Sequence, residues 1–160
     1  VHITPERTAR RIVRAGVAAR SRNSAWPERK GVYAMPLLPS FTATHQWVRE
    51  LRRWRAGVLT AVQVRIPDDE LVAVGHYGRQ PDVMPAAQAA SVVRGLADPR
   101  GYEVFIPRRL HPAEVRRVRP VPQGVGWRYQ PDAHGRRPCP CPCCLAPGTP
   151  GVAKVRRAEQ

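Results

Sequence analysis

Three residues far apart in the chain are of types that can act together on a sugar bond. His2 lies in "HIT", Tyr33 in "GVYAMP" and Glu103 in "GYEVFIP". Cleavage of a glycosidic bond passes through an oxocarbenium-like sugar, and a nearby carboxylate stabilises the positive charge that develops there. Glu103 is therefore the candidate for this role if the fold brings the three side chains together.

Each of these residues also has an ordinary structural interpretation. His2 is then a frayed terminal residue, and Tyr33 is a half-buried strand aromatic. Glu103 is then the solvent-facing residue of an alternating strand. The interpretation as a site depends on the occurrence of all three motifs in this order.

Together the three motifs resemble the His-Tyr-Glu branch of the ADP-ribosyltransferases over most of residues 1–120. This diphtheria-toxin-like class includes poly-ADP-ribose polymerases, RNA 2′-phosphotransferases and DarT-type DNA-modifying toxins. The similarity lies in His-x-Thr followed by a short helix ending at glycine, an aromatic strand, and a late strand whose glutamate precedes a hydrophobic run. It implies an α+β ADP-ribosyltransferase-like fold, with two small packed β-sheets and flanking helices.

The resemblance also implies a reaction, in which ADP-ribose moves from NAD to a macromolecular acceptor. Glu103 would stabilise the ribose cation and bind a ribose hydroxyl. His2 would hold the same ribose, and Tyr33 would stack on the nicotinamide. These three residues are the expected catalytic set.

Further contacts to NAD are implied by the same resemblance. The main chain at Ile3 would bind the carboxamide, and Thr4 would support the histidine. A second aromatic beside the nicotinamide would come from Tyr77 or from Tyr102, with Tyr77 taken as the NAD-binding residue. A toxin-like enzyme of this class would also have a neutralising partner protein.

Two other assignments within this fold are considered. "SFTAT" at 40–44 is similar to a strand of the Arg-Ser-Glu branch, but Gly101 stands where that branch usually carries Glu or Gln. The RNA 2′-phosphotransferase reaction is a related alternative. It is not the main assignment, because those enzymes hold the 2′-phosphate with several arginines at defined motifs, which the sequence does not place.

The composition favours a polyanionic partner such as DNA or RNA. The 160 residues include 27 Lys and Arg against 12 Asp and Glu, for a formal net charge of +15. Such a surface attracts nucleic acid, although arginine-rich compositions are also typical of GC-rich genomes. Trp47 and Trp54 lie among arginines and would suit base stacking, but with Leu51 they also fit a core stripe.

Four cysteines lie close together in the C-terminal segment 121–160, which is rich in Pro, Gly and basic residues and is predicted to be a tail. Cys141 and Cys144 have C-x-x-C spacing, and Cys139 and His134 would complete four ligands to one zinc. A disordered thiol-bearing tail and a redox-sensing role are the other interpretations. A non-catalytic, zinc-dependent nucleic-acid-binding module is therefore the alternative to an enzyme.

Periodicity and turn residues predict the order of the elements. Helices are expected at about 5–15, 44–55 and 86–94, with Thr4 as the cap of the first. Strands are expected around 31–35, 58–66, 70–75 and 102–106, with a turn and a last strand in 110–121. No segment approaches the ~18 apolar residues of a membrane span, and no secretory signal is recognised. We therefore expect one soluble, cytoplasmic catalytic domain over 1–120, with no membrane partner.

Overall fold

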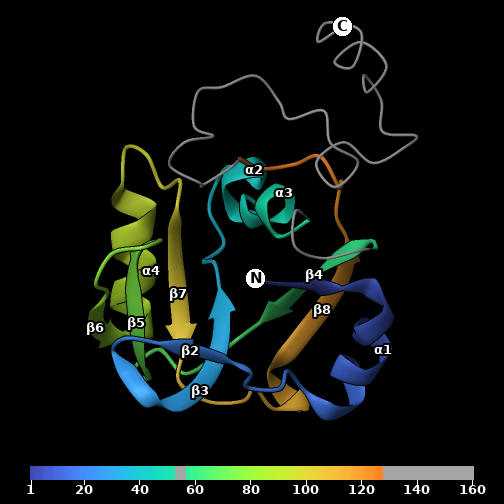
Figure 1. The fold of residues 1–160 in the computed structure, drawn as a ribbon, viewed down its shortest axis with the longest axis horizontal. Coiled ribbons are helices and arrows are strands. Elements are labelled where there is room, and N and C mark those ends of the chain that lie inside the picture. Colours follow the sequence, from blue (N-terminus) through green and yellow to red (C-terminus); the bar gives the residue numbers. More distant parts are fainter. Residues whose placement is uncertain (53–56, 128–160) are drawn as a thin grey trace, which may run out of the picture.

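A computed structural model describes residues 1–52 and 57–127 of the chain (Figure 1). Its strands are β1 (His2–Pro5), β2 (Ser21–Asn23), β3 (Trp26–Ala34), β4 (Leu59–Val64), β5 (Leu71–His76), β6 (Asp82–Pro85), β7 (Tyr102–Ile106) and β8 (Val115–Pro120). Its helices are α1 (Glu6–Ala15), α2 (Phe41–Thr44), α3 (Trp47–Leu51), α4 (Ala86–Gly95) and the 3-10 turn η1 (Pro112–Glu114).

The strands form two antiparallel sheets, which confirms the predicted α+β class with two small sheets. One sheet has the order β1-β4-β8, and the other has the order β2-β3-β7-β5-β6. In Figure 1, α4 lies beside the larger sheet, while α1 lies on the opposite side of the molecule, beside the smaller sheet. The predicted order of helices and strands matches the structure except at β6, which was not predicted, and in three further segments.

The first helix does not begin where the sequence predicts. Thr4 belongs to β1, where it pairs with Thr60 of β4, and the helix cap is Pro5 without a side-chain hydrogen bond. The Thr4 hydroxyl instead contacts the Thr8 hydroxyl at 3.0 Å. Gly16 ends the helix as expected, with φ of 73°, and a Cβ there would lie 1.9 Å from a backbone oxygen.

The second correction concerns residues 17–27, in which the sequence predicts a polar, basic loop before the strand at 31–35. The structure forms a β2–β3 hairpin there, and β3 begins at Trp26 instead of at Gly31. Pro27 is tolerated because a proline lacks only the N–H donor, and β3 pairs with β7 farther along, at 32–34. The exposed polar side chains of this segment hid its strand character.

The third correction concerns the predicted helix at 44–55. The structure has two short helices instead, because Ser40 caps α2 and the chain turns at His45 before α3 begins. The Ser40 hydroxyl accepts from the Ala43 amide at 3.2 Å. Trp54, which belonged to the predicted aromatic stripe, lies outside the described residues.

The main hydrophobic core joins α1, α4 and both sheets. Its fully buried members include Val62 of β4, Val72 of β5, Val93 of α4 and Leu110. A smaller cluster packs α3 against β4 through Val48 and Leu59, and Val121 also belongs to it. The described chain therefore continues to pack on the fold after β8.

A half-buried ion-pair network holds the connection between β7 and β8. The Arg108 guanidinium contacts the carboxylate of Glu70 at 2.5 Å and that of Glu114 at 2.6 Å. Hydrogen bonds from Arg108 hold the pKa of Glu114 below its usual range. Within residues 1–52 and 57–127, no helix is both long and apolar enough to cross a membrane.

Candidate active site

A cavity of about 300 Å³ lies where the edge of the smaller sheet meets the larger sheet. His2 of β1, Tyr33 of β3 and Glu103 of β7 all line it, and so does Tyr77 from the turn after β5. These four residues were selected from the sequence, and the fold brings them together across 101 positions. The other lining residues are Val1, Ile3, Ser21, Ala34, Met35, Trp47, Glu50 and Leu51.

The His2 ring is oriented by the strand that carries the tyrosine. Its Nδ1 lies 2.8 Å from the carbonyl oxygen of Tyr33. Because a carbonyl oxygen only accepts, Nδ1 is the donor in this hydrogen bond. β1 pairs with β4 through His2 and Val62, so this histidine is part of a sheet and not a frayed terminal residue.

Tyr33 is fixed at both ends of its side chain. Its hydroxyl donates to the carbonyl oxygen of Arg22 at 3.0 Å and accepts from Asn23 Nδ2 at 3.1 Å, both from β2. Its ring packs on Phe105, with centroids 5.0 Å apart. Burial, followed by the negative charge of Glu103, raises the pKa of the phenol, so the neutral hydroxyl persists. The ring is therefore held as a fixed wall of the cavity.

Glu103 shares a face of the larger sheet with this tyrosine. Tyr33 pairs with Phe105, and Glu103 precedes that phenylalanine by two residues, so alternation places both cavity residues on one face. Gly75 lies opposite Glu103 on β5. Burial raises the pKa of Glu103 to about 7. The carboxyl group is thus partly removed from water, unlike the exposed carboxylate of an ordinary alternating strand.

The second aromatic of the cavity is Tyr77. Its ring meets the Trp47 ring edge-on at 5.6 Å, and its side chain is 51% exposed. The alternative, Tyr102, is not among the described residues lining the cavity, and its ring packs edge-on against His76. The two tyrosines that can contact a flat ring here are therefore Tyr33 and Tyr77.

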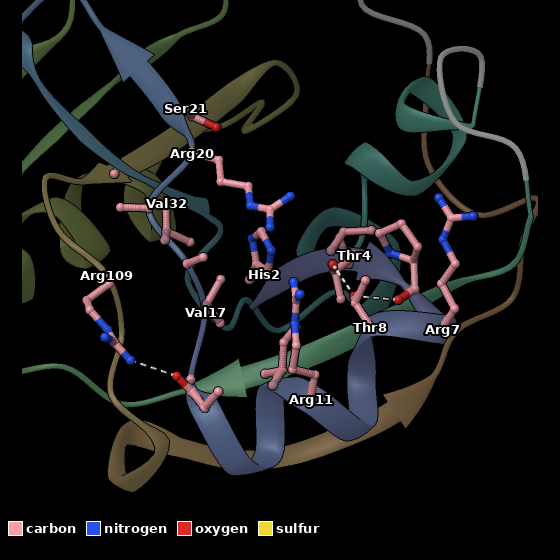
Figure 2. A pocket seen from close by; sticks show the side chains of 18 residues that line it. His2, Thr4, Arg7, Thr8, Arg11, Val17, Arg20, Ser21, Val32 and Arg109 are labelled. Atoms are coloured by element: carbon pink, nitrogen blue, oxygen red, sulfur yellow. Dashed lines mark hydrogen bonds between the residues drawn. The ribbon is translucent and has the colours of Figure 1, made fainter.

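A second, larger cavity of about 730 Å³ adjoins the first (Figure 2). It lies between α1 and the 16–21 segment, and it is lined by Arg7, Arg11, Arg20 and Arg109. In Figure 2, the side chains of Arg11 and Arg20 extend toward His2 from two sides. The Arg109 guanidinium also donates to the carbonyl oxygen of Ala15 at 2.9 Å.

The two cavities meet at β1. His2, Ile3 and Ser21 line both of them. Thr4 lines only the larger cavity, where its hydroxyl continues a chain of hydrogen bonds through Thr8 to the carbonyl oxygen of Pro5. A ligand with a flat aromatic end and an anionic end would therefore find one compartment for each end, joined at the histidine.

Several site residues were missed by sequence reasoning. Glu50 is 7% exposed and lines the smaller cavity, although its segment was interpreted as a basic helix. Arg11, Arg20 and Arg109 could not be assigned, because arginine is common throughout this chain. The signal available in the sequence was the position of one acidic residue, Glu50, between the apolar residues of "WVREL".

The predicted zinc ligands cannot be placed. His134, Cys139, Cys141 and Cys144 lie outside the described residues. Among residues 1–52 and 57–127 there is no group of three or more His, Cys, Asp or Glu side chains suited to a metal ion. The zinc site stays a prediction from the sequence.

Comparison with known proteins gives no family assignment. No family model, no curated protein and no solved structure matches this chain. The residues and geometry of the two cavities are therefore the basis for inferring function.

Proposed function

We propose that this protein is an NAD-dependent ADP-ribosyltransferase with an ADP-ribosyltransferase-like fold, and that residues 1–120 carry its activity. The observation that supports this best is the shared cavity of His2, Tyr33 and Glu103 beside an arginine-lined one. NAD has the matching chemistry: a flat cationic nicotinamide at one end, and a diphosphate with adenosine at the other. The proposal places the reaction in the cytoplasm.

The smaller cavity has the groups needed for cleavage of the nicotinamide–ribose bond. Tyr33 and Tyr77 offer two ring surfaces for the nicotinamide, and the main chain at Ile3 is beside it for the carboxamide. The His2 ring lines the cavity and is placed to hydrogen-bond a ribose hydroxyl. Because Nδ1 is held by the carbonyl of Tyr33, the ring needs no reorientation when the substrate binds.

Glu103 supplies the negative charge in this scheme. The bond between ribose C1′ and the nicotinamide nitrogen breaks, its electron pair leaves with nicotinamide, and positive charge develops on the ribose. A partly buried carboxylate stabilises this charge more strongly than one in water. The cationic nicotinamide also favours the ionised carboxylate, which lowers the raised pKa of Glu103 when NAD binds.

The larger cavity is assigned to the diphosphate end of NAD. Arg11 and Arg20 lie nearest to the junction at His2 in Figure 2. The planar guanidinium group presents paired N–H donors that match phosphate oxygens. Removal of either arginine is therefore expected to weaken NAD binding more than it slows bond cleavage.

The decisive experiment compares wild-type protein with Glu103→Gln. Glutamine keeps the shape and ground-state contacts but withdraws charge from the developing cation, so turnover should fall about 100- to 1,000-fold, or roughly 3 to 4 kcal/mol. Affinity for NAD, measured by calorimetry, should change little. Nicotinamide release is followed by chromatography, and equal release by both proteins would exclude the proposed role of Glu103.

A further inference from the structure

The outer surface of α1 carries a row of like charges. Arg7, Arg10, Arg11 and Arg14 are all exposed and recur at spacings of three and four residues, so they share one face of the helix within an arc of about 100°. We call this set the α1 arginine row. Among the residues the structure describes, none of its members forms an ion pair within 4 Å.

This arrangement is unfavourable for the isolated protein. Like charges three and four residues apart on a helix repel one another. Arg7 also lies in the first turn, where the positive end of the helix dipole disfavours a cation. Glu6 is the helix's acidic residue, and within the described part of the chain it forms no ion pair with the row. A surface that is destabilising alone is expected to have a partner that supplies negative charge.

The row lies between two hollows. Arg7 and Arg11 line the 730 Å³ cavity, while Arg7 and Arg10 line a second hollow of about 570 Å³ against β4 and β8. From Arg7 to Arg14 the helix spans about 10 Å, a length over which the row can contact more than one phosphate of a nucleic-acid strand. Phosphates along α1 would therefore lead directly to the proposed NAD cavity.

The chemistry of this face favours nucleic acid over an acidic protein. Val13 is the one large hydrophobic residue that is strongly exposed on α1, at 55%, so the helix lacks the apolar centre that a protein partner normally buries. All four charges are guanidinium groups, which bind phosphate oxygens through paired N–H donors. Chemistry on a base inside a small cavity also requires an unpaired strand.

We propose that Arg7, Arg10 and Arg14 of the α1 arginine row bind the phosphate backbone of single-stranded nucleic acid and present it to the active site as the acceptor of ADP-ribose, while Arg11 faces the NAD diphosphate. In the transfer, a nucleophilic oxygen or nitrogen of the nucleic acid bonds to ribose C1′ as the C1′–nicotinamide bond breaks. Nicotinamide leaves with the bonding electron pair, and the proton of the nucleophile is released to water. The role of nucleic acid as the acceptor rests on the proposed function, whereas the binding itself does not. DNA and RNA share the phosphate chemistry involved, and the test has an arm for each.

The test uses the full chain and fluorescein-labelled dT12 and rU12, with anisotropy measured over a range of salt concentrations. Arg10→Gln/Arg14→Gln removes two charges of the row that lie outside both site cavities, and glutamine keeps helix propensity. The slope of the logarithm of the binding constant against the logarithm of the salt concentration should fall in magnitude by about 1.4. Affinity at 0.1 M salt should fall by about 20-fold. The matched control is Arg79→Gln/Arg94→Gln, which removes the same charge away from α1 and should leave the slope unchanged.

Three results would overturn this proposal: no binding of either oligonucleotide, an equal loss in the control, or displacement of the probe as readily by polyglutamate as by unlabelled oligonucleotide. The last result would point to an acidic protein partner. Nicotinamide release from NAD, measured without oligonucleotide, separates the proposed enzymatic function from the proposed nucleic-acid binding. The Arg10→Gln/Arg14→Gln variant should retain this release. Binding that depends on α1 in a protein without NAD turnover would exclude only the proposed enzymatic function.

Discussion

The indole Nε1 of Trp47 donates a hydrogen bond of 2.8 Å to the carbonyl oxygen of Tyr102, the residue that precedes Glu103. α3 thereby fixes the start of β7 at the point where this strand carries its carboxylate into the cavity. The neighbouring Gln46 side chain holds the turn before it, accepting from the Gly101 amide at 2.8 Å. Two adjacent residues outside the strand therefore set the position of the proposed catalytic glutamate.

Trp47→Phe should test this positioning role. Phenylalanine keeps much of the apolar contact but leaves the Tyr102 carbonyl without the indole donor, at a cost of about 1 to 2 kcal/mol of unfolding free energy. Turnover should fall about tenfold, and the pH at which activity rises should shift, because Glu103 moves relative to the ribose. Lower stability with an unchanged pH profile and turnover would assign Trp47 a structural role alone.

The raised pKa of Glu103 predicts an unusual dependence of stability on pH. This carboxyl has a pKa of about 7 in the folded protein, against an ordinary pKa of 4.5 for glutamate. Folded protein therefore binds more protons than unfolded protein between these values, so its contribution to stability is fully present below pH 4.5 and is lost as pH rises through 7. The loss amounts to about 3 kcal/mol.

Glu103→Gln isolates this contribution. The variant should be more stable than wild type at pH 8 and nearly equal to it at pH 4.5, as measured by chemical denaturation at both values. Wild-type kcat/KM for NAD should rise with pH through about 7, because the ionised carboxylate is the active form. A wild-type protein whose stability advantage over the variant grows above pH 7 would contradict the burial of this group.

Tyr33 is predicted to contribute to binding more than to cleavage. Tyr33→Ala removes the ring surface and should weaken NAD binding about tenfold, since a stacked aromatic contact is worth roughly 1 to 3 kcal/mol. Tyr33→Phe is the matched control, because it keeps the ring and loses only the hydroxyl bonds to β2. Calorimetry should find the Phe variant close to wild type; an equal loss in both would assign the effect to anchoring of the strand.

The Arg108 network should stabilise the fold without affecting NAD binding. Arg108→Gln leaves Glu70 and Glu114 without their cation, and we expect a loss of about 2 kcal/mol at pH 7. Since Arg108 lowers the pKa of Glu114, the stabilisation is present above the ordinary carboxyl pKa and disappears as the pH falls through the lowered one. Denaturation curves of the two proteins should therefore converge in acid, and a constant difference down to pH 2 would contradict this account.

The cysteine segment gives a prediction that is based only on the spacing of cysteines in the sequence. If His134, Cys139, Cys141 and Cys144 hold zinc, elemental analysis should find about one zinc per chain, and Cys141→Ser should release it. The fold of residues 1–120 should persist, as judged by an unchanged circular dichroism spectrum. Full zinc retention by this variant would exclude the proposed ligand set.

The sequence was most informative where side-chain alternation and turn residues agreed. β4 was predicted because apolar and polar residues alternate along it, whereas β5 and β7 were predicted as short apolar runs bounded by turn residues. Gly101 has φ of 79°, the left-handed conformation that the predicted turn before β7 requires. The position of Glu103 on a strand was therefore predictable from local patterns.

The elements and site residues that the sequence did not predict depend on contacts between distant segments. The residues around Ser21 and Trp26 show no strand pattern in the sequence. This polar segment forms strands because β2 pairs with β3, and β3 pairs with β7. The larger cavity was also unpredictable, because α1 contributes Arg11 and the segment after it contributes Arg20, and only the fold sets them on opposite sides of His2. Chain order identifies candidate groups, whereas packing determines which of them face one another.

The hydrogen bond from His2 to the Tyr33 carbonyl also joins two sheets that share no strand. With the bond from the Met35 amide to the carbonyl of Val1, it forms a short seam between the edge of β1 and the end of β3. A ligand bound to both sheets would add a further connection between them. Hydrogen exchange of the Met35 amide, which donates to Val1, should therefore slow when the site is filled, while amides in the middle of β4 keep their rates.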